Sequence, residues 1–379
     1  MAQQSRERLK HSHRLEELVE HMPDYVWEYV QAKKRLDYSP SSLLGYMHDF
    51  QLFFQWLITE SIAKDCKEIK EIPYTVLESL KKAEVESFFD YLREPYKKNE
   101  YETITRSSER VLRIQNALKS LFNYLTTETE IETGENQGEC YFYRNVMAKI
   151  KTKKKAETKS SRAKRISSDM ISRNVFIEFM EFLDKEYVTL RDNNDNLLLS
   201  EREKKLYERD KERFMALYAV AFGSGVRVSE LCNITLSDID FKKETIDVIR
   251  KGNKRDTILI SKLGLEYLNK YLSIRQERYK PAKENKYVFL TKYNGKANPI
   301  SPRTVQSSLK RHTTAFNETG KSISPHKLRH SFASEWILNG GDLVTLRDQL
   351  GQNSIETTSL YTNISLDEAR RIMNKMDEE

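Results

Sequence analysis

A strongly basic segment in the middle of the chain limits how the protein can fold. Residues 151–165 read KTKKKAETKSSRAKR and hold eight basic side chains, one acidic side chain and no large apolar group. Such a segment cannot build a hydrophobic core, so a chain of 379 residues interrupted by it is expected to form two domains. We predict a charged leader at 1–20, a helical domain at 21–150, a basic linker at 151–168 and a second domain at 169–379.

The placement of charge is more informative than its total. Lysine and arginine number 64 and aspartate and glutamate 57, which gives a net charge of +7. A linker this basic is best explained if it lies against an anion such as a DNA backbone, and Lys153, Lys154 and Lys155 are then candidate DNA-binding residues. The alternative is a solvated tether between the domains.

The cysteines and the hydropathy of the sequence indicate the cellular compartment in which the protein works. The three cysteines, Cys66, Cys140 and Cys232, show no pairing pattern and no CxxC motif, which is typical of a reducing environment. The N-terminal segment lacks the apolar core of a signal peptide, and no run of about eighteen apolar residues occurs in the sequence. We therefore expect a cytoplasmic protein that does not enter a membrane.

The first domain is predicted to be a small helical bundle. One helix begins at Ser39-Pro40, where serine suits the N-cap and proline the first helical position, and its apolar residues recur at helical spacing. A second helix is predicted around 107–125. Along one face it carries three arginines at helical spacing, Arg106, Arg110 and Arg113. These side chains either bind phosphates or form an ordinary solvated face.

The second domain is predicted to be mostly helical with one small sheet. An apolar helix, FMALYAVAFGSG, ends at glycines and precedes alternating segments around 234–241, 245–249 and 257–260. Among the helices that follow, one opens at Ser324-Pro325 and closes at Gly340-Gly341. The predicted fold class is therefore mainly α with a small antiparallel β-sheet.

Two segments of the second domain place cations at turns. In GSGVRVSEL the glycines leave Arg227 at a helix start, where it can face a ligand or pair with Glu230. In VIRKGNKRD, Lys251 lies at a hairpin tip whose turn is supplied by Gly252-Asn253. Either segment alone is also typical of a surface turn. Two further basic residues compete with Lys251 for the same role, Lys254 and Arg255.

Two later segments add a histidine, an arginine and a phenol. In PHKLRHSFA, His326 and Arg329 project from the same side of a helix start, where anions are favoured. His330 is spaced from His326 like a metal-binding pair, but Lys327 replaces the glutamate of HExxH and no third ligand is evident. We predict no metal site and a structural role for His330. LGQNSIETTSLYTNI then places Tyr361 among polar residues.

Taken in order, the four segments resemble the catalytic domain of the tyrosine recombinases, the phage integrase family. The matching motifs are R-x-x-E, K-G-N, H-x-L-R-H and L-G-x-x-S-x-x-T-T-x-x-Y-T, within Phe214 to Thr362. The first domain is similar, more loosely, to the helical core-binding (SAM-like) domain of that family, which implies an α+β catalytic domain after it. Within the family the chain most resembles the Xer recombinases, especially the single-protein XerS-like form.

The resemblance implies a role for each matched residue. Tyr361 would be the nucleophile and Glu230 a supporting carboxylate. Gln352 stands where the family usually has histidine or tryptophan, and an amide can donate to a phosphate oxygen but cannot carry a proton. Four residues would surround the scissile phosphate, Arg227, Lys251, His326 and Arg329.

The resemblance also implies a reaction and its partners. A homotetramer on a near-palindromic site of double-stranded DNA would cut and rejoin strands through a 3′-phosphotyrosine and a Holliday junction, without metal or cofactor. Xer-type chromosome dimer resolution under an FtsK-like DNA translocase is the favoured role. An integrase of a phage or conjugative transposon and a catalytically degenerate DNA-binding protein remain alternatives. A metal-dependent nuclease is disfavoured because no acidic cluster suited to magnesium stands out.

Overall fold

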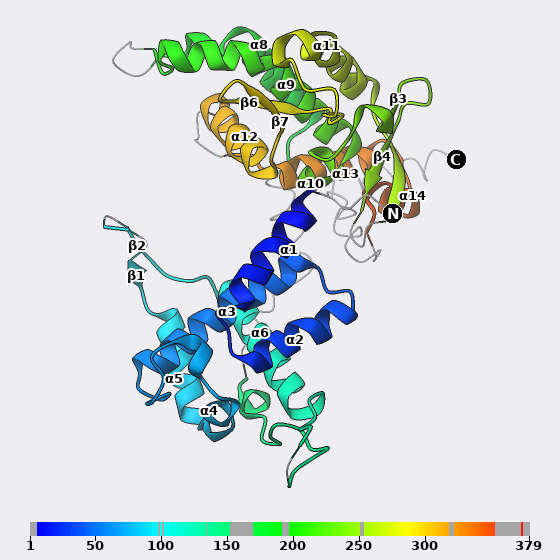
Figure 1. Cartoon of the computed structure of the whole chain (residues 1–379). Helices are drawn as coiled ribbons and strands as arrows, with labels where there is room; N and C mark the ends of the chain where they lie inside the picture. The colour runs from blue at the N-terminus through cyan, green and yellow to red at the C-terminus, as the bar shows by residue number, and fades with distance from the viewer. Residues whose placement is uncertain are drawn as a thin grey trace. The chain divides into compact units, whose positions relative to one another are not determined.

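The computed structural model describes residues 6–97, 99–100, 102–133, 135–151, 170–191, 197–250, 254–317, 322–352 and 373 (Figure 1). The chain divides into two compact units, residues 1–156 and 157–379. Nearly all of the segment that we predicted as a linker, 151–168, lies outside the described residues, and with it Lys153, Lys154 and Lys155.

The first unit is built mainly from helices. Ser39 caps α3 (Pro40–Thr59), where its Oγ accepts a hydrogen bond from the Ser42 amide at 3.2 Å and Pro40 takes the first helical position, as predicted. A second serine, Ser107, caps α6 (Ser108–Thr127) in the same way. The other elements are α1 (Arg6–Val19), α2 (Asp24–Arg35), η1 (Ile69–Glu71), α4 (Tyr74–Ser79), α5 (Lys82–Arg93), β1 (Tyr96–Lys97), β2 (Thr103–Ile104) and η2 (Val146–Lys149).

The two predicted helices bury their apolar faces in one core. Phe50, Phe53 and Phe54 of α3 are fully buried, and the Phe53 ring lies edge-on to Phe88 of α5 with ring centroids 4.9 Å apart. α6 contributes the side chains predicted to face inwards, Ile114, Leu118, Leu121 and Leu125. The helical bundle predicted for this part of the chain is therefore confirmed.

The segment predicted as a charged leader contains a helix. α1 packs on α3, and its Leu15 and Val19 are buried. These side chains are four residues apart and so lie on one face of the helix. Because charged residues surround them in the sequence, this narrow apolar face is easily overlooked.

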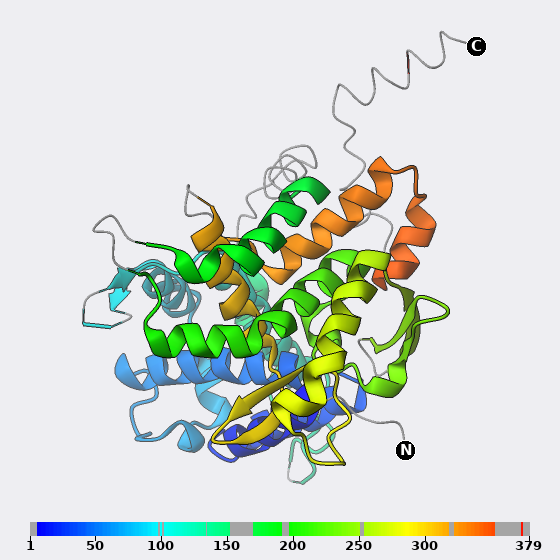
Figure 2. The same cartoon turned by 90° about the horizontal axis from the view of Figure 1, so that it is seen from above.

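The second unit is organised around α9 (Glu201–Ser224). α11 (Lys262–Tyr279) and α13 (Pro325–Leu338) pack along it (Figures 1 and 2), and residues 214–222 of α9 are buried throughout. β3 (Ile239–Asp240), β4 (Thr245–Ile249) and β5 (Arg255–Leu259) form an antiparallel sheet in chain order. The predicted class, mainly α with a small antiparallel sheet, is confirmed. The other elements are α8 (Arg173–Lys185), η3 (Tyr187–Thr189), α10 (Val228–Leu231), η4 (Leu236–Asp238), β6 (Leu290–Tyr293), β7 (Lys296–Pro299), α12 (Pro302–Phe316) and α14 (Leu343–Leu350).

The apolar helix predicted before Gly225 begins earlier than expected, because charged residues from Glu201 onward belong to the same helix, α9. Asp210 and Arg213 in the charged part are buried and form an ion pair at 3.2 Å. This buried pair lies where the charged part of α9 meets its apolar part, and the helix is continuous through both.

Two parts of the predicted strand pattern are also corrected. Within the segment 234–241, Leu236–Asp238 form the 3-10 helix η4, where the Asp238 carboxylate accepts a hydrogen bond from the Thr235 amide at 2.8 Å, and Ile239–Asp240 pair as β3. The hairpin of β6 and β7 was not predicted.

Gly225, the predicted glycine end of α9, allows a test of the packing. It has a left-handed φ of 66°, and a Cβ would lie 2.5 Å from Cδ1 of Phe332 and 2.7 Å from Cδ2 of Leu350. Gly225→Ala is expected to lower the free energy of unfolding by about 2–5 kcal/mol, from backbone strain plus overpacking. Urea titration measures this loss.

Gly295→Ala is the matched control, because Gly295 has a φ of 77° but nothing within 4 Å of the added carbon. This variant is expected to lower the free energy of unfolding only by the backbone strain, about 1–2 kcal/mol. Equal losses for the two variants would contradict the steric contribution at Gly225.

Candidate active site

Arg227 and Glu230 are held together at the start of α10. The amide of Arg227 donates to Glu230 Oε2 at 3.0 Å and its Nη1 donates to Oε1 at 2.8 Å. Nη2 donates to the carbonyl of Gly351 at 3.0 Å. The arginine is thus fixed by a buried carboxylate and a backbone oxygen, yet its side chain is 38% exposed and can meet a ligand.

Arg329 lies deeper than Arg227 and is held by two helix ends. Its Nη1 donates to the carbonyl of Gly225 at 2.7 Å and its Nη2 to the carbonyl of Leu350 at 2.6 Å. These oxygens belong to the C-terminal ends of α9 and α14, where the helix dipole favours a cation. Arg329 is only 4% exposed, so the fold fixes this charge at one position.

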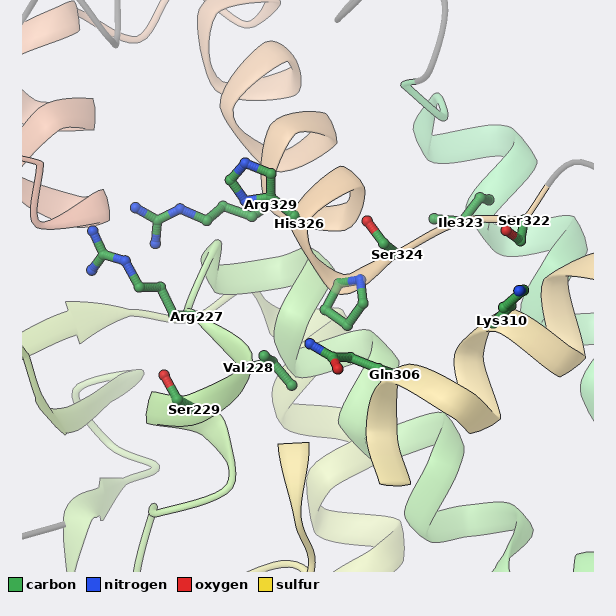
Figure 3. A pocket seen from close by; sticks show the side chains of 11 residues that line it. Arg227, Val228, Ser229, Gln306, Lys310, Ser322, Ile323, Ser324, His326 and Arg329 are labelled. Atoms are coloured by element: carbon green, nitrogen blue, oxygen red, sulfur yellow. The ribbon is translucent and has the colours of Figure 1, made fainter. Parts of the chain in front are cut away.

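A cavity of about 500 Å³ brings Arg227, His326 and Arg329 together (Figure 3). The two guanidinium groups and the imidazole gather at one end, Lys310 of α12 lies at the other end, and Gln306 lies between them. The N-terminal end of α13 also lines the cavity. Several N–H donors beside a helix N-terminus suit an anion with several oxygens, such as a phosphodiester.

His326 has an electrostatic environment that favours the neutral imidazole. Desolvation and the charges of Arg329 and Arg227 lower the pKa of His326 below its usual value. A neutral ring at physiological pH can accept a proton.

Removing one neighbouring charge is therefore expected to raise the pKa of His326. In Arg227→Gln this pKa should move toward the ordinary value of about 6.5, as measured by an NMR titration of the ring nitrogens. Arg209→Gln, on α9 outside the cavity, is the control and should leave the pKa of His326 as it was. An unchanged or lower value in Arg227→Gln would contradict the electrostatic coupling.

Sequence reasoning did not identify Arg250, which follows β4. Its Nη1 donates to Glu230 Oε2 at 3.0 Å and its Nη2 to the carbonyl of Gln349 at 2.7 Å. A signal was present, because Ile246 and Val248 are the buried residues of β4 and the alternation of a strand puts Arg250 on the same face.

The other predicted catalytic residues are only partly described. Gln352 follows the end of α14, where its backbone N–H donates to the carbonyl of Arg347 at 3.1 Å. Lys251, the Gly252-Asn253 turn and Tyr361 lie outside the described residues. Arg255, which competed with Lys251 in the sequence, is bound to Asp247 and Asp238 of the sheet region at 3.0 and 2.8 Å. Three predicted residues line the cavity, Arg227, His326 and Arg329. A fourth, Glu230, is bound to Arg227.

The three predicted DNA-binding arginines of the first unit differ in their surroundings. Arg110 and Arg113 form ion pairs at 2.7 and 2.8 Å with Asp49 of α3, which is fully buried. Desolvation raises the pKa of Asp49 to about 6, although Arg110 opposes the rise. Arg106 lies over the Tyr96 ring at 4.2 Å. Two of the three arginines are thus partly neutralised by an internal carboxylate.

The described parts of the chain contain neither a candidate metal site nor a helix that could span a membrane. There, no group of three or more His, Cys, Asp and Glu side chains is arranged to hold a metal ion. The rings of His326 and His330 are 4.2 Å apart, without a third candidate ligand in that group. Among the described helices, none is long and apolar enough to cross a bilayer.

Comparison with known proteins places this chain in a family. The model of the phage integrase family matches residues 188–368. The XerH site-specific recombinase bound to difH substrate superposes with a TM-score of 0.59 at 19% identity, covering 90% of this chain and 82% of that chain. The Tn1549 transposon integrase in complex with circular intermediate DNA gives a TM-score of 0.56 at 16% identity, covering 93% and 99%. At such identities these likenesses establish the fold.

Curated relatives match along nearly the whole chain. The tyrosine recombinases XerS of Streptococcus uberis and Streptococcus gordonii are each 38% identical over 364 residues, which cover 96% of this chain and 98% of the relative. The chain therefore belongs to the tyrosine recombinases, and among them to the XerS type.

Proposed function

We propose that the protein cuts and rejoins double-stranded DNA through a covalent link to Tyr361. The observation that carries the proposal is the convergence of Arg227, Arg329 and His326 on one cavity (Figure 3). Two fixed guanidinium groups suit the non-bridging oxygens of a phosphodiester, where charge builds up during the reaction. DNA as substrate is carried over from similar recombinases solved on DNA.

Each residue of the proposed set has one task. The phenolic oxygen of Tyr361 attacks the phosphorus, and the bond to the 5′ oxygen breaks, which leaves a 3′-phosphotyrosine. His326 accepts the phenolic proton, because a tyrosine with an ordinary pKa of about 10 does not ionise unaided at neutral pH. Lys251 donates a proton to the departing 5′ oxygen. Gln352 donates its amide to a phosphate oxygen, and Glu230 holds Arg227.

The proposed reaction is reversible without an external energy source. The phosphotyrosine conserves the free energy of the phosphodiester bond, so a 5′ hydroxyl of a partner strand can attack it and release Tyr361. This exchange of one phosphoester bond for another needs no metal and no nucleotide cofactor. Exchange between two duplexes then proceeds through a Holliday junction within a homotetramer on a near-palindromic site.

The proposed role is Xer-type chromosome dimer resolution in the cytoplasm, under an FtsK-like DNA translocase. Similarity to XerS proteins along 96% of the chain supports this role. The fold shared with the Tn1549 transposon integrase keeps integration of a mobile element as the alternative. Gln352 is the feature that favours a third candidate, a DNA-binding protein with impaired catalysis.

Sequencing of trapped adducts tests these roles. The protein is mixed with nicked fragments of host DNA, denaturant-resistant adducts are collected, and the attached DNA is sequenced. Adducts at one near-palindromic chromosomal site are expected. Adducts at the ends of a mobile element would support the integrase instead, and DNA binding without any adduct would support impaired catalysis.

The basic linker supplies a separate prediction about DNA affinity. Replacing Lys153, Lys154 and Lys155 with alanine is expected to weaken binding and to reduce the salt dependence, by about 0.9 in the log–log slope for each phosphate that is no longer neutralised. The measurement is a DNA titration at several salt concentrations. A parent-like slope would mean that these lysines belong to a tether which does not touch DNA.

A further inference from the structure

We propose that Arg250 is a positioning residue that fixes Arg227 and Arg329 relative to each other. The inference deepens the proposed function and rests on it. Arg250 is only 9% exposed, and all three of its nitrogens donate to internal partners. One partner, Asp256, lies on β5, and the others lie at the start of α10 and the end of α14, where Arg227 and Arg329 are also bound.

The link to Arg227 runs through Glu230. Oε1 of this carboxylate accepts from Arg227 Nη1 at 2.8 Å, whereas Oε2 accepts from two donors, Arg250 Nη1 and the Arg227 amide, each at 3.0 Å. Glu230 is buried, so it depends on both guanidinium groups for compensation of its charge. Loss of Arg250 would leave Oε2 bound to the Arg227 amide but without a guanidinium, so the buried carboxylate would draw the side chain of Arg227 toward itself and away from the cavity.

The link to Arg329 runs through the end of α14. Nη1 of Arg250 also donates to the Leu350 carbonyl at 3.3 Å, and the same oxygen accepts from Arg329 Nη2 at 2.6 Å. The preceding carbonyl, of Gln349, accepts from Arg250, and the following one, of Gly351, accepts from Arg227. Three successive carbonyls at a helix C-terminus therefore bind three arginines, an arrangement that the helix dipole stabilises.

The surrounding residues keep Arg250 in this position. Asp256, on the opposite strand, accepts from its Nε at 3.0 Å. Gly351 lies so close that a Cβ would be 2.6 Å from Nε, and its φ of 58° is a left-handed value. The planar guanidinium group of Arg250 therefore packs directly on the backbone of Gly351, where a side chain would not fit. Arg250 also directly precedes Lys251 in the sequence, but its positioning role follows from its described hydrogen bonds alone.

The test compares two substrates that differ at the scissile phosphate. Single-turnover adduct formation is measured on a nicked duplex with an ordinary phosphate and on one with an uncharged methylphosphonate, where arginine charge matters less. Arg250→Met is expected to slow the first reaction by about 100-fold, with DNA affinity changed less than about threefold. On the methylphosphonate the slowing should shrink to less than about tenfold. Arg250→Lys keeps the charge but lacks the planar guanidinium group. Its rate of adduct formation should lie between those of the parent protein and Arg250→Met.

Arg275→Met is the control for loss of a buried arginine. Arg275 is also buried and donates to backbone carbonyls, those of Val288 and Tyr287, but it does not line the cavity. Its variant should lose stability and keep the parent rate on both substrates. A parent-like rate for Arg250→Met, or equal slowing on both substrates, would overturn the proposal.

A second readout does not depend on activity. The pKa of His326 should rise in Arg250→Met, because Arg227 and Arg329 move away from the ring, and should stay unchanged in Arg275→Met. Failure of the parent protein to form any adduct would reject the proposed function, whereas an unchanged pKa of His326 in Arg250→Met would reject the positioning role.

Discussion

Tyr361→Phe is expected to bind DNA like the parent protein and to form no covalent adduct, a loss of at least about a thousandfold in the rate of attachment. Phenylalanine keeps the aromatic ring but has no oxygen that can attack phosphorus. DNA recognition by the remaining residues is unaffected by this change. The measurement is a denaturing gel of end-labelled, nicked DNA after incubation with the protein.

A second tyrosine of the same unit provides the control. Tyr293 on β6 is exposed and lies outside the cavity, so Tyr293→Phe should retain full attachment. An adduct formed by Tyr361→Phe would assign the nucleophile to another residue and would remove the basis of the proposed mechanism.

Arg227→Lys is expected to reduce the rate of adduct formation by about 100-fold, which corresponds to about 2.7 kcal/mol of transition-state stabilisation. Lysine keeps the charge but lacks the planar fork. It cannot bind Glu230 and the Gly351 carbonyl and also present a donor to the phosphate, as Arg227 can. Single-turnover kinetics on a nicked duplex measures the effect.

The stability of Arg227→Lys separates chemistry from folding. Because lysine keeps a positive charge beside the buried Glu230 and the side chain of Arg227 is partly exposed, the replacement should change the unfolding midpoint little. Arg209→Lys, a change of the same kind on α9 outside the cavity, should keep the parent rate. A rate for Arg227→Lys within about twofold of the parent would show that the fork geometry is not needed, contrary to the expected oxyanion stabilisation.

Local signals made much of the fold predictable. Ser39-Pro40 and Ser324-Pro325 begin α3 and α13 as predicted, because capping is decided by a few neighbouring residues. Gly225 ends α9 for an equally local reason, its left-handed backbone. By contrast, the continuation of α9 through charged residues depends on ion pairs inside the core, which periodicity alone does not show.

The candidate site was predictable where residue type and order sufficed. Arg227, His326 and Arg329 were predicted from motifs, and the cavity brings them together. Arg250 was missed because its importance comes from the end of α14, which lies about a hundred residues further along the chain. Asp49 was missed for a related reason, since spacing predicts an arginine face on α6 but not the carboxylate of α3 that packs under it.

Peptide mapping of the trapped adduct tests the covalent mechanism most directly. Cleavage after arginine releases residues 348–370, a peptide whose single tyrosine is Tyr361. After nuclease trimming, mass spectrometry should find this peptide carrying a nucleotide through its 3′ phosphate, and the other DNA fragment should end in a 5′ hydroxyl. A nucleotide on a different residue, or a 5′ phosphate on the released fragment, would contradict the mechanism.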